Sequence, residues 1–124
     1  MDIHIEIVSE TLHWPESFDS ESGGVVRFSG IVRGEESGRK IEGLVYEAYQ
    51  PMAEKKMRQI LEELCREHPF QKAAVLHRVG FVPVGEAAII VEVQAAHRGE
   101  AFAAASQFMD RLKKDVPIWK IEAK

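Results

Sequence analysis

The order of the apolar patterns restricts the fold of this sequence more than any other feature. Residues 2–8 alternate apolar and polar side chains, which predicts a strand with one buried face. A polar loop is expected over 9–22, and a glycine pair then opens a second strand over 25–33. A third strand is predicted over 41–49. The stretch 34–40 contains no apolar residue, and we expect it to be a mobile connection that forms a hairpin between these two strands.

Two segments show helical periodicity. The first follows Pro51, which suits the first turn of a helix, and it ends before Pro69. Its buried stripe comprises Ala53, Met57, Ile60, Leu61, Leu64 and Cys65. The second runs from about Arg98 to Asp115, because Pro117 prevents its continuation. Its apolar face comprises Ala101, Phe102, Ala105, Phe108, Met109 and Leu112.

Two further strands, 73–79 and 87–93, lie between the helices and are separated by glycine and proline breakers. Their imperfect alternation indicates that both are covered on two faces. A short strand over 118–123 ends the pattern. The order is βββαββαβ, in which most strands follow one another without a crossover helix. The sequence therefore predicts an α+β fold with a mostly antiparallel sheet and two main helices.

Length and composition predict an ordinary globular protein. The 124 residues suit a single domain over 1–124. No window has the roughly 20 apolar residues of a membrane span, and the N-terminus lacks the features of a signal peptide. The single cysteine, Cys65, has no disulfide partner, which indicates a reducing, cytoplasmic location. The net charge of −4 argues against binding to nucleic acid.

Basic residues gather in the last quarter of this acidic chain. His97 and Arg98 stand where a buried strand gives way to a helix whose first N–H groups attract anions. Ala95 and Ala96 supply no capping oxygen, so these donors are available to a ligand. The pair would then bind an anionic substrate. The alternative is a solvated arginine beside a packed histidine.

Two lysines follow this pair. Lys113 borders the buried stripe of the second helix, whereas Lys114 points about 100° further round and is solvated. Lys113 either extends its amine to water or, partly desolvated, acts as a base or nucleophile. Trp119 and Lys120 face opposite sides of a strand, so a buried Trp119 would turn Lys120 toward a cleft or toward solvent.

Two other basic positions stay open. Arg33 ends a strand, where it either closes over a ligand or terminates the strand in water. His77 and Arg78 lie within a strand, and we assign them a structural or interface role. The five histidines show no metal-ligand spacing, and there is no phosphate-binding glycine loop. Cys65 is expected to be a packed thiol. We therefore expect no metal and no resident cofactor.

Together these segments resemble the catalytic (large) subunit family of molybdopterin synthase. The matching segments are Phe28–Arg33, Leu44–Tyr49 with Met52–Ala53, His77–Gly80, Val84–Glu86, Ala96–Arg98 with Ala101–Phe102, and Leu112–Lys113 with Pro117–Glu122. They occur in the family's order and spacing over about residues 23–122. Family members often continue with a C-terminal tail that reaches the active site of a neighbouring subunit, whereas this sequence ends at Lys124.

The resemblance implies an α/β-hammerhead fold and a sulfurtransferase activity. The enzyme would convert cyclic pyranopterin monophosphate (precursor Z) into molybdopterin, a step of molybdenum cofactor biosynthesis. Sulfur would come from the C-terminal Gly-Gly thiocarboxylate of a small ubiquitin-like subunit. It would attack a carbon of the substrate side chain, and the acyl group would then be hydrolysed off. Two large subunits would form a homodimer with one small subunit at each end, giving a heterotetramer.

The resemblance also implies the roles of particular residues. Lys113 would meet the thiocarboxylate, and Lys120 would lie near the pterin, both as catalytic residues. The remaining substrate-binding residues would be Ile31, Val32, Arg33, His97, Arg98, Ile121 and Glu122. Two rival readings remain, in which the same basic residues serve a non-catalytic phosphometabolite-binding module or a module that only docks a ubiquitin-like protein.

Overall fold

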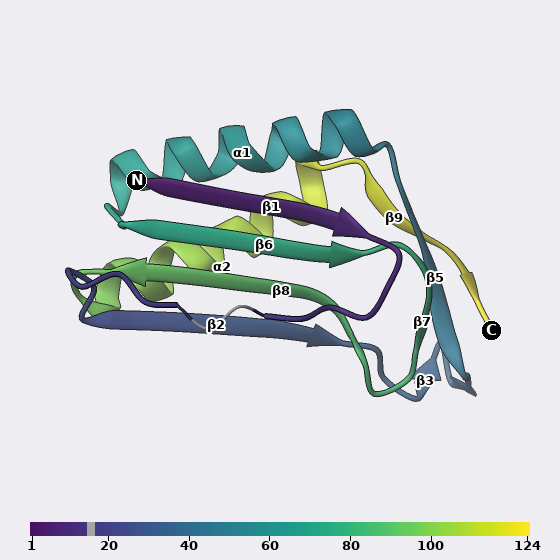
Figure 1. Ribbon diagram of the computed structural model, residues 1–124. Coiled ribbons are helices and arrows are strands. Elements are labelled where there is room, and N and C mark those ends of the chain that lie inside the picture. The colour runs from purple at the N-terminus through teal and green to yellow at the C-terminus, as the bar shows by residue number, and fades with distance from the viewer. Residues whose placement is uncertain (15–16) are drawn as a thin grey trace.

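The largest element of the computed structural model is a four-stranded sheet in the order β1-β6-β8-β2 (Figure 1). Its strands are β1 (Asp2–Val8), β6 (Lys72–Arg78), β8 (Ala87–Ala95) and β2 (Gly24–Ile31). β1 and β6 are parallel, whereas β8 is antiparallel to both of its neighbours. Three of these strands lie where the sequence predicted them. β2 ends two residues early, because its register with β8 shifts between Gly30 and Ile31.

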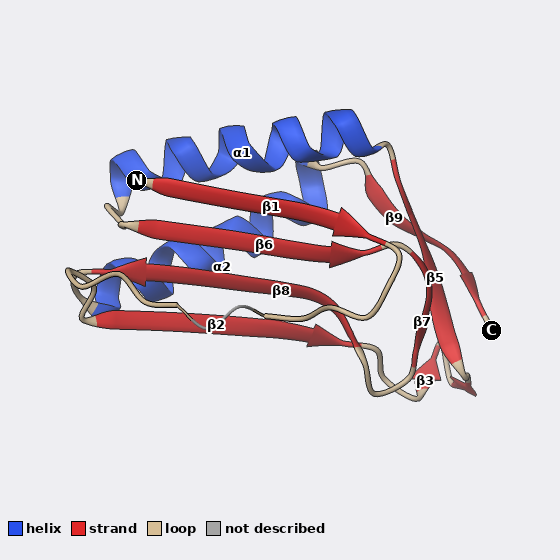
Figure 2. Cartoon of the chain, viewed as in Figure 1, coloured by secondary structure: helices blue, strands red, loops and turns tan. Residues whose placement is uncertain are grey.

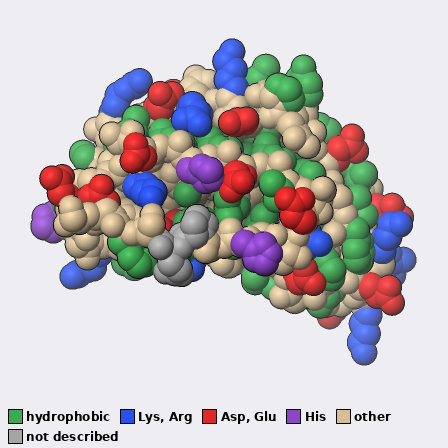
Figure 3. Space-filling model, viewed as in Figure 1, with side chains coloured by type: hydrophobic (Ala, Val, Ile, Leu, Met, Phe, Trp, Pro, Cys, Tyr) green, Lys and Arg blue, Asp and Glu red, His purple; other side chains and the backbone are tan. Residues whose placement is uncertain are grey.

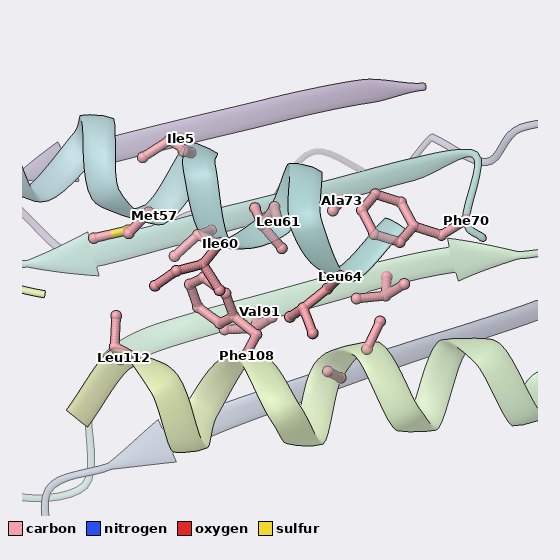
Figure 4. Packing of buried hydrophobic residues seen from close by; sticks show 14 of the residues in the cluster. Ile5, Met57, Ile60, Leu61, Leu64, Phe70, Ala73, Val91, Phe108 and Leu112 are labelled. Atoms are coloured by element: carbon pink, nitrogen blue, oxygen red, sulfur yellow. The ribbon is translucent and has the colours of Figure 1, made fainter. Parts of the chain in front are cut away.

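Two helices of 18 residues each, α1 (Gln50–Glu67) and α2 (Arg98–Asp115), cover one face of this sheet (Figure 2). Pro51 stands in the first turn of α1, as predicted. Figure 4 shows the core between the helices and the sheet, with Met57, Leu61 and Phe108 pointing into it. The predicted stripes are confirmed with one exception. Phe102 is 59% exposed, because the first turns of α2 place Ala101, Ala104 and Ala105 against the sheet instead.

The opposite face of the sheet is covered by the segment between β1 and β2. The structure describes residues 1–14 and 17–124, so Pro15 and Glu16 of the predicted loop lie outside the described residues. The Gln94 side chain holds this segment, since its amide donates to the Ser17 carbonyl at 2.9 Å and accepts from the Asp19 amide at 2.8 Å. Glu92 accepts from Arg27 at 3.0 Å. The prediction that β8 is buried on both faces is confirmed, and this burial explains why apolar and polar residues alternate imperfectly along β8.

A second, smaller sheet stands at one end of the first, in the order β7-β5-β9. It comprises β7 (Gly80–Pro83), β5 (Gly43–Ala48) and β9 (Ile118–Ala123), all antiparallel. The sequence did not predict β7, since Gly80 and Pro83 were interpreted as breakers. Gly80 has φ of +82°, which turns the chain out of β6 into the second sheet, and Pro83 is tolerated because β7 is an edge strand.

The polar stretch 34–40 forms a hairpin of its own, not the predicted connection between paired strands. β3 (Glu35–Glu36) pairs with β4 (Arg39–Lys40) across Ser37 and Gly38, whose φ angles of 52° and 77° suit a tight two-residue turn. The strands on either side, β2 and β5, belong to different sheets. The fold class is nevertheless as predicted, an α+β fold with two main helices and mostly antiparallel sheets.

On the described residues of the face in Figure 3, acidic and basic side chains are interspersed without a continuous basic stripe. No helix among the described residues is long and apolar enough to span a membrane.

Replacement of Phe108 by alanine tests the core. Phe108 is fully buried between α2, α1 and the sheet, so Phe108→Ala should lower the free energy of unfolding by about 3–5 kcal/mol. Urea denaturation followed by circular dichroism measures the change. Phe18→Ala is the matched control, because Phe18 is 61% exposed and its loss should change stability by less than about 0.5 kcal/mol. Equal effects of the two substitutions would contradict this description of the core.

Candidate functional site

A pocket of about 380 Å³ opens where the two sheets and the C-terminal end of α2 meet. We call it the junction pocket. Its lining comprises Phe28, Gly30 and Ile31 of β2, Tyr46 of β5, His77 of β6, Ala88 and Ile89 of β8, Met109, Leu112 and Lys113 of α2, and Ile118, Trp119 and Lys120 of β9. Six elements, spread from β2 to β9 along the chain, therefore build one site.

Both predicted lysines line this pocket. Lys113 comes from the last turn of α2, at the border of the buried stripe, as the helical spacing predicted. Lys120 comes from β9, and its Nζ lies 3.5 Å from Oε2 of Glu36 in the β3–β4 hairpin. Because both side chains of this pair are solvent-accessible, the ion pair contributes little to stability and leaves Lys120 available to an anionic ligand.

The sequence left open whether Trp119 is buried, and the structure shows that it is not. Its side chain is 46% exposed and lines the same pocket as Lys120. The pairing of β9 with β5 is irregular here, since Tyr46 pairs with Lys120 but Val45 pairs with Glu122. The extra residue is Ile121, so the irregularity follows Lys120, and the pairs of Trp119 with Glu47 and of Lys120 with Tyr46 stay regular.

Glycine at position 30 keeps the floor of the pocket open. A Cβ atom at this position would lie 2.8 Å from Cγ2 of Ile89 and 3.6 Å from the ring of Phe28. A larger residue would therefore displace pocket walls. Phe28, Ile89 and Met109 give the cavity an apolar surface on which a planar ring system can lie.

His77 and Tyr46 are pocket residues that the sequence did not assign to the site. Their rings meet edge to face, with centroids 5.5 Å apart and an interplanar angle of 70°. Burial lowers the pKa of His77, and the hydrogen bond to the Arg78 carbonyl offsets this in part. Burial, and secondarily the Glu36 carboxylate, raise the pKa of Tyr46. The signal that could have placed His77 is Gly80, which redirects the chain immediately after this strand.

The predicted anion-binding pair stands at the other end of α2. His97 is the N-cap residue and makes no side-chain capping bond, so the free N–H donors of the first turn are present as predicted. At 1.5 Å per residue, the helix keeps Arg98 about 22 Å from Lys113. Within one chain, His97 and Arg98 therefore do not meet the two lysines.

Of the other predicted substrate contacts, Ile31 lines the junction pocket, and Val32, Arg33, Ile121 and Glu122 do not. Val32 is buried under the second sheet, and Arg33 lines a separate hollow with the β3–β4 hairpin. Ile121 is half exposed, and Glu122 is exposed with its carboxylate 3.9 Å from the Lys124 amine.

The described residues offer no metal centre, since no three His, Cys, Asp or Glu side chains among them come together. Cys65 is a free thiol that packs against the main core and donates to the Phe70 carbonyl at 3.4 Å. This agrees with the packed thiol that the sequence predicted.

The fold and the pocket define a small α+β protein with two lysines and aromatic rings in one cavity. The chain belongs to the MoaE protein family, whose model matches residues 2–115. The molybdopterin synthase catalytic subunit of Pyrococcus abyssi is 48% identical over 103 residues, which cover 83% of this chain and 70% of the relative. The resemblance seen in the sequence is thereby confirmed.

Solved structures agree with this assignment. Molybdopterin synthase from Staphylococcus aureus has a TM-score of 0.87 at 35% identity, covering 95% of this chain and 93% of that chain. A complex of subunits 1 and 2 of molybdopterin-converting factor from Helicobacter pylori shares the fold, with a TM-score of 0.75 at 20% identity over 94% of this chain and 82% of that one. The chain spans about half the length of the human, bovine and rat catalytic subunits that it also matches.

The lowered pKa of His77 predicts a specific loss of stability in acid. Below about pH 6.5 the unfolded chain binds a proton at this imidazole before the folded chain does, so the free energy of unfolding falls with decreasing pH. Asparagine at position 77 removes this contribution. Denaturation at about pH 7.5 and about pH 5.5 should therefore show a smaller acid-induced loss for His77→Asn than for the unmodified chain.

The exposed His4 provides the control, since His4→Asn should keep the full acid-induced loss. An unchanged pH dependence in His77→Asn would contradict the proposed environment of the imidazole.

Proposed function

We propose that this chain is the catalytic subunit of a molybdopterin synthase, a sulfurtransferase that converts precursor Z into molybdopterin. The observation that carries this proposal is the junction pocket, where Lys113 and Lys120 share a cavity with apolar and aromatic walls. The walls suit a planar pterin, and the amines suit the anionic ends of a thiocarboxylate and a phosphate. The sulfur donor is a small ubiquitin-like subunit whose C-terminal thiocarboxylate enters this pocket, and the enzyme works in the cytoplasm.

The geometry supports a division of labour between the lysines. Lys113 attracts the thiocarboxylate at the helix end, and Lys120 lies beside the pterin next to Trp119. Held side by side, the sulfur and the substrate side chain react as one bound pair, which provides the entropic advantage of proximity. Sulfur bonds to a side-chain carbon of the pterin as the bond from that carbon to an oxygen of the cyclic phosphate breaks. The phosphate oxygen leaves with the electron pair, and the partner stays attached through a thioester. Water then releases the partner, and a second partner repeats the transfer.

The phosphate contacts require a second copy of the chain. Arg98 and Lys113 lie at opposite ends of α2, so one chain cannot bind both ends of a small substrate. A two-fold homodimer that places two α2 helices antiparallel would bring His97 and Arg98 of one copy to the lysines of the other. The exposed apolar side chains of Phe28 and Phe102 beside α2 favour this surface. One small subunit at each end would complete a heterotetramer.

Replacement of Lys113 tests the catalytic assignment. In reconstitution with thiocarboxylated partner and precursor Z, Lys113→Ala should lower the turnover number by at least about 100-fold. Lys114→Ala is the matched control, because the neighbouring amine is exposed and lies outside the pocket lining, so turnover should persist. Full turnover by Lys113→Ala would refute the role of this lysine. Substrate binding without product, even in the unmodified chain, would indicate a binding module instead of an enzyme.

Hybrid dimers test whether each site is shared between two copies. Lys113→Ala and Arg98→Ala chains are each expected to be impaired. Consider a dimer that pairs one Lys113→Ala chain with one Arg98→Ala chain. It contains one site with both Lys113 and Arg98 intact only if each site takes these two residues from different copies. Equal mixing of the refolded chains should then restore about a quarter of the unmodified activity. No recovery on mixing, with dimers present by sedimentation, would show that each chain builds its own site.

A further inference from the structure

His77 is a titratable residue of the junction pocket that the proposed roles of the two lysines leave unused. It is 4% exposed and stands at the end of β6, on the same face of the sheet as Ala73 and Val75, toward the helices. It nevertheless lines the pocket. Burial of an imidazole nitrogen without a hydrogen-bond partner is unfavourable, so the buried position of His77 needs an explanation.

The hydrogen bond of His77 determines which nitrogen faces the pocket. Nδ1 lies 2.9 Å from the Arg78 carbonyl oxygen, and because a carbonyl can only accept, Nδ1 carries the proton. Nε2 therefore holds a free lone pair in the neutral ring. Nε2 has no hydrogen-bond partner among the described residues, yet it is absent from the polar atoms that are fully enclosed without one. It is accessible from the pocket.

The surroundings fix this orientation. Arg78, whose carbonyl receives the Nδ1 proton, is itself held by an ion pair between its Nη1 and Oε1 of Glu86 at 2.6 Å. The amide of Val79 donates to the Val8 carbonyl at 2.8 Å, which anchors the same peptide segment to β1. On the other side, the Tyr46 ring packs edge-on against the imidazole. The ring itself is held by the hydrogen bond to the Arg78 carbonyl and by the Tyr46 ring before any ligand binds.

The other polar side chains of the pocket are donors. The ammonium groups of Lys113 and Lys120 can donate but not accept, and the raised pKa of Tyr46 keeps its hydroxyl proton in place. The proposed reaction requires a proton acceptor, because a thioester between the partner and the pterin must be hydrolysed before the partner leaves. Water attacks such an acyl carbon readily only when a base takes up its proton.

We infer that His77 is the general base of this release step, a role that rests on the proposed function. Nε2 removes a proton from water as the water oxygen bonds to the acyl carbon of the thioester. The tetrahedral intermediate collapses, the carbon–sulfur bond breaks, and sulfur stays on the pterin side chain as a thiolate. The new carboxylic acid of the tail ionises, and the imidazolium returns its proton to solvent. One thioester and one water thus give a carboxylate, a thiolate and two protons, without any oxidation or reduction.

Two variants distinguish the role of His77 as a base from its role in packing and hydrogen bonding. Asparagine can still donate to the Arg78 carbonyl from about the Nδ1 position, and glutamine places an amide near the Nε2 position, but neither is a base. A single turnover of the reconstituted complex is quenched in acid, and the small subunit is weighed by intact mass spectrometry. His77→Asn and His77→Gln should both accumulate partner bearing the pterin mass and release it at least about 100-fold more slowly.

Hydroxylamine provides a second measurement, because this nucleophile cleaves thioesters without a base. It should clear the accumulated adduct in both variants and leave a hydroxamate on the partner's tail. His4→Asn, with an exposed imidazole on β1, should release partner at the unmodified rate.

The possible failures are distinguishable. Absence of product from the unmodified complex would refute the proposed function itself. Product from the unmodified complex, together with no adduct and unslowed release in both folded variants, would refute the role of His77 alone. Slowing of adduct formation and adduct release by the same factor would also refute it, since a loss of general packing affects both steps.

Discussion

The contact of α2 with the four-stranded sheet is the interaction on which the rest of the site depends. The small residues Ala101, Ala104 and Ala105 bring the first half of the helix close to the sheet, and Phe108 and Leu112 continue the buried stripe to its end. Because this stripe packs along the whole helix, the position of α2 on the sheet is fixed. Lys113 is therefore held at the junction pocket, while His97 and Arg98 are held at the other end of the same helix, about 22 Å away.

The second constraint is the change of sheet after His77. β6 belongs to the four-stranded sheet, and two residues later Gly80 starts β7 in the second sheet with a φ of +82°. The junction pocket exists because the chain turns here, so that Tyr46 of β5 and Lys120 of β9 face the end of β6. Tyr46 and Lys120 are paired neighbours on β5 and β9, and the turn at Gly80 joins their sheet to the strand that carries the buried imidazole.

Much of the fold could be predicted from local patterns. Helix periodicity located α1 and α2, and proline marked the start of the first and the end of the second. The predictions failed where one residue type is compatible with two structures. Gly80 and Pro83 were interpreted as strand breakers, yet Gly80 forms the turn between the two sheets and Pro83 is the last residue of an edge strand. Phe102 fits the helical stripe, but it lies on a flank of α2 that is left exposed in the described part of the chain.

The sequence by itself determined both helices, most of the long strands, the α+β class, the family and the two lysines of the pocket, because each of these depends on short spacing or on residue motifs. Only the tertiary structure decided which of the basic residues share a cavity. Helix rise separates Arg98 from Lys113, whereas Lys113 and Lys120, from two different elements, line the same pocket. The sequence assigned His77 only a structural or interface role, and the fold adds that its buried ring lines the pocket, oriented by a hydrogen bond that appears only when the chain is folded.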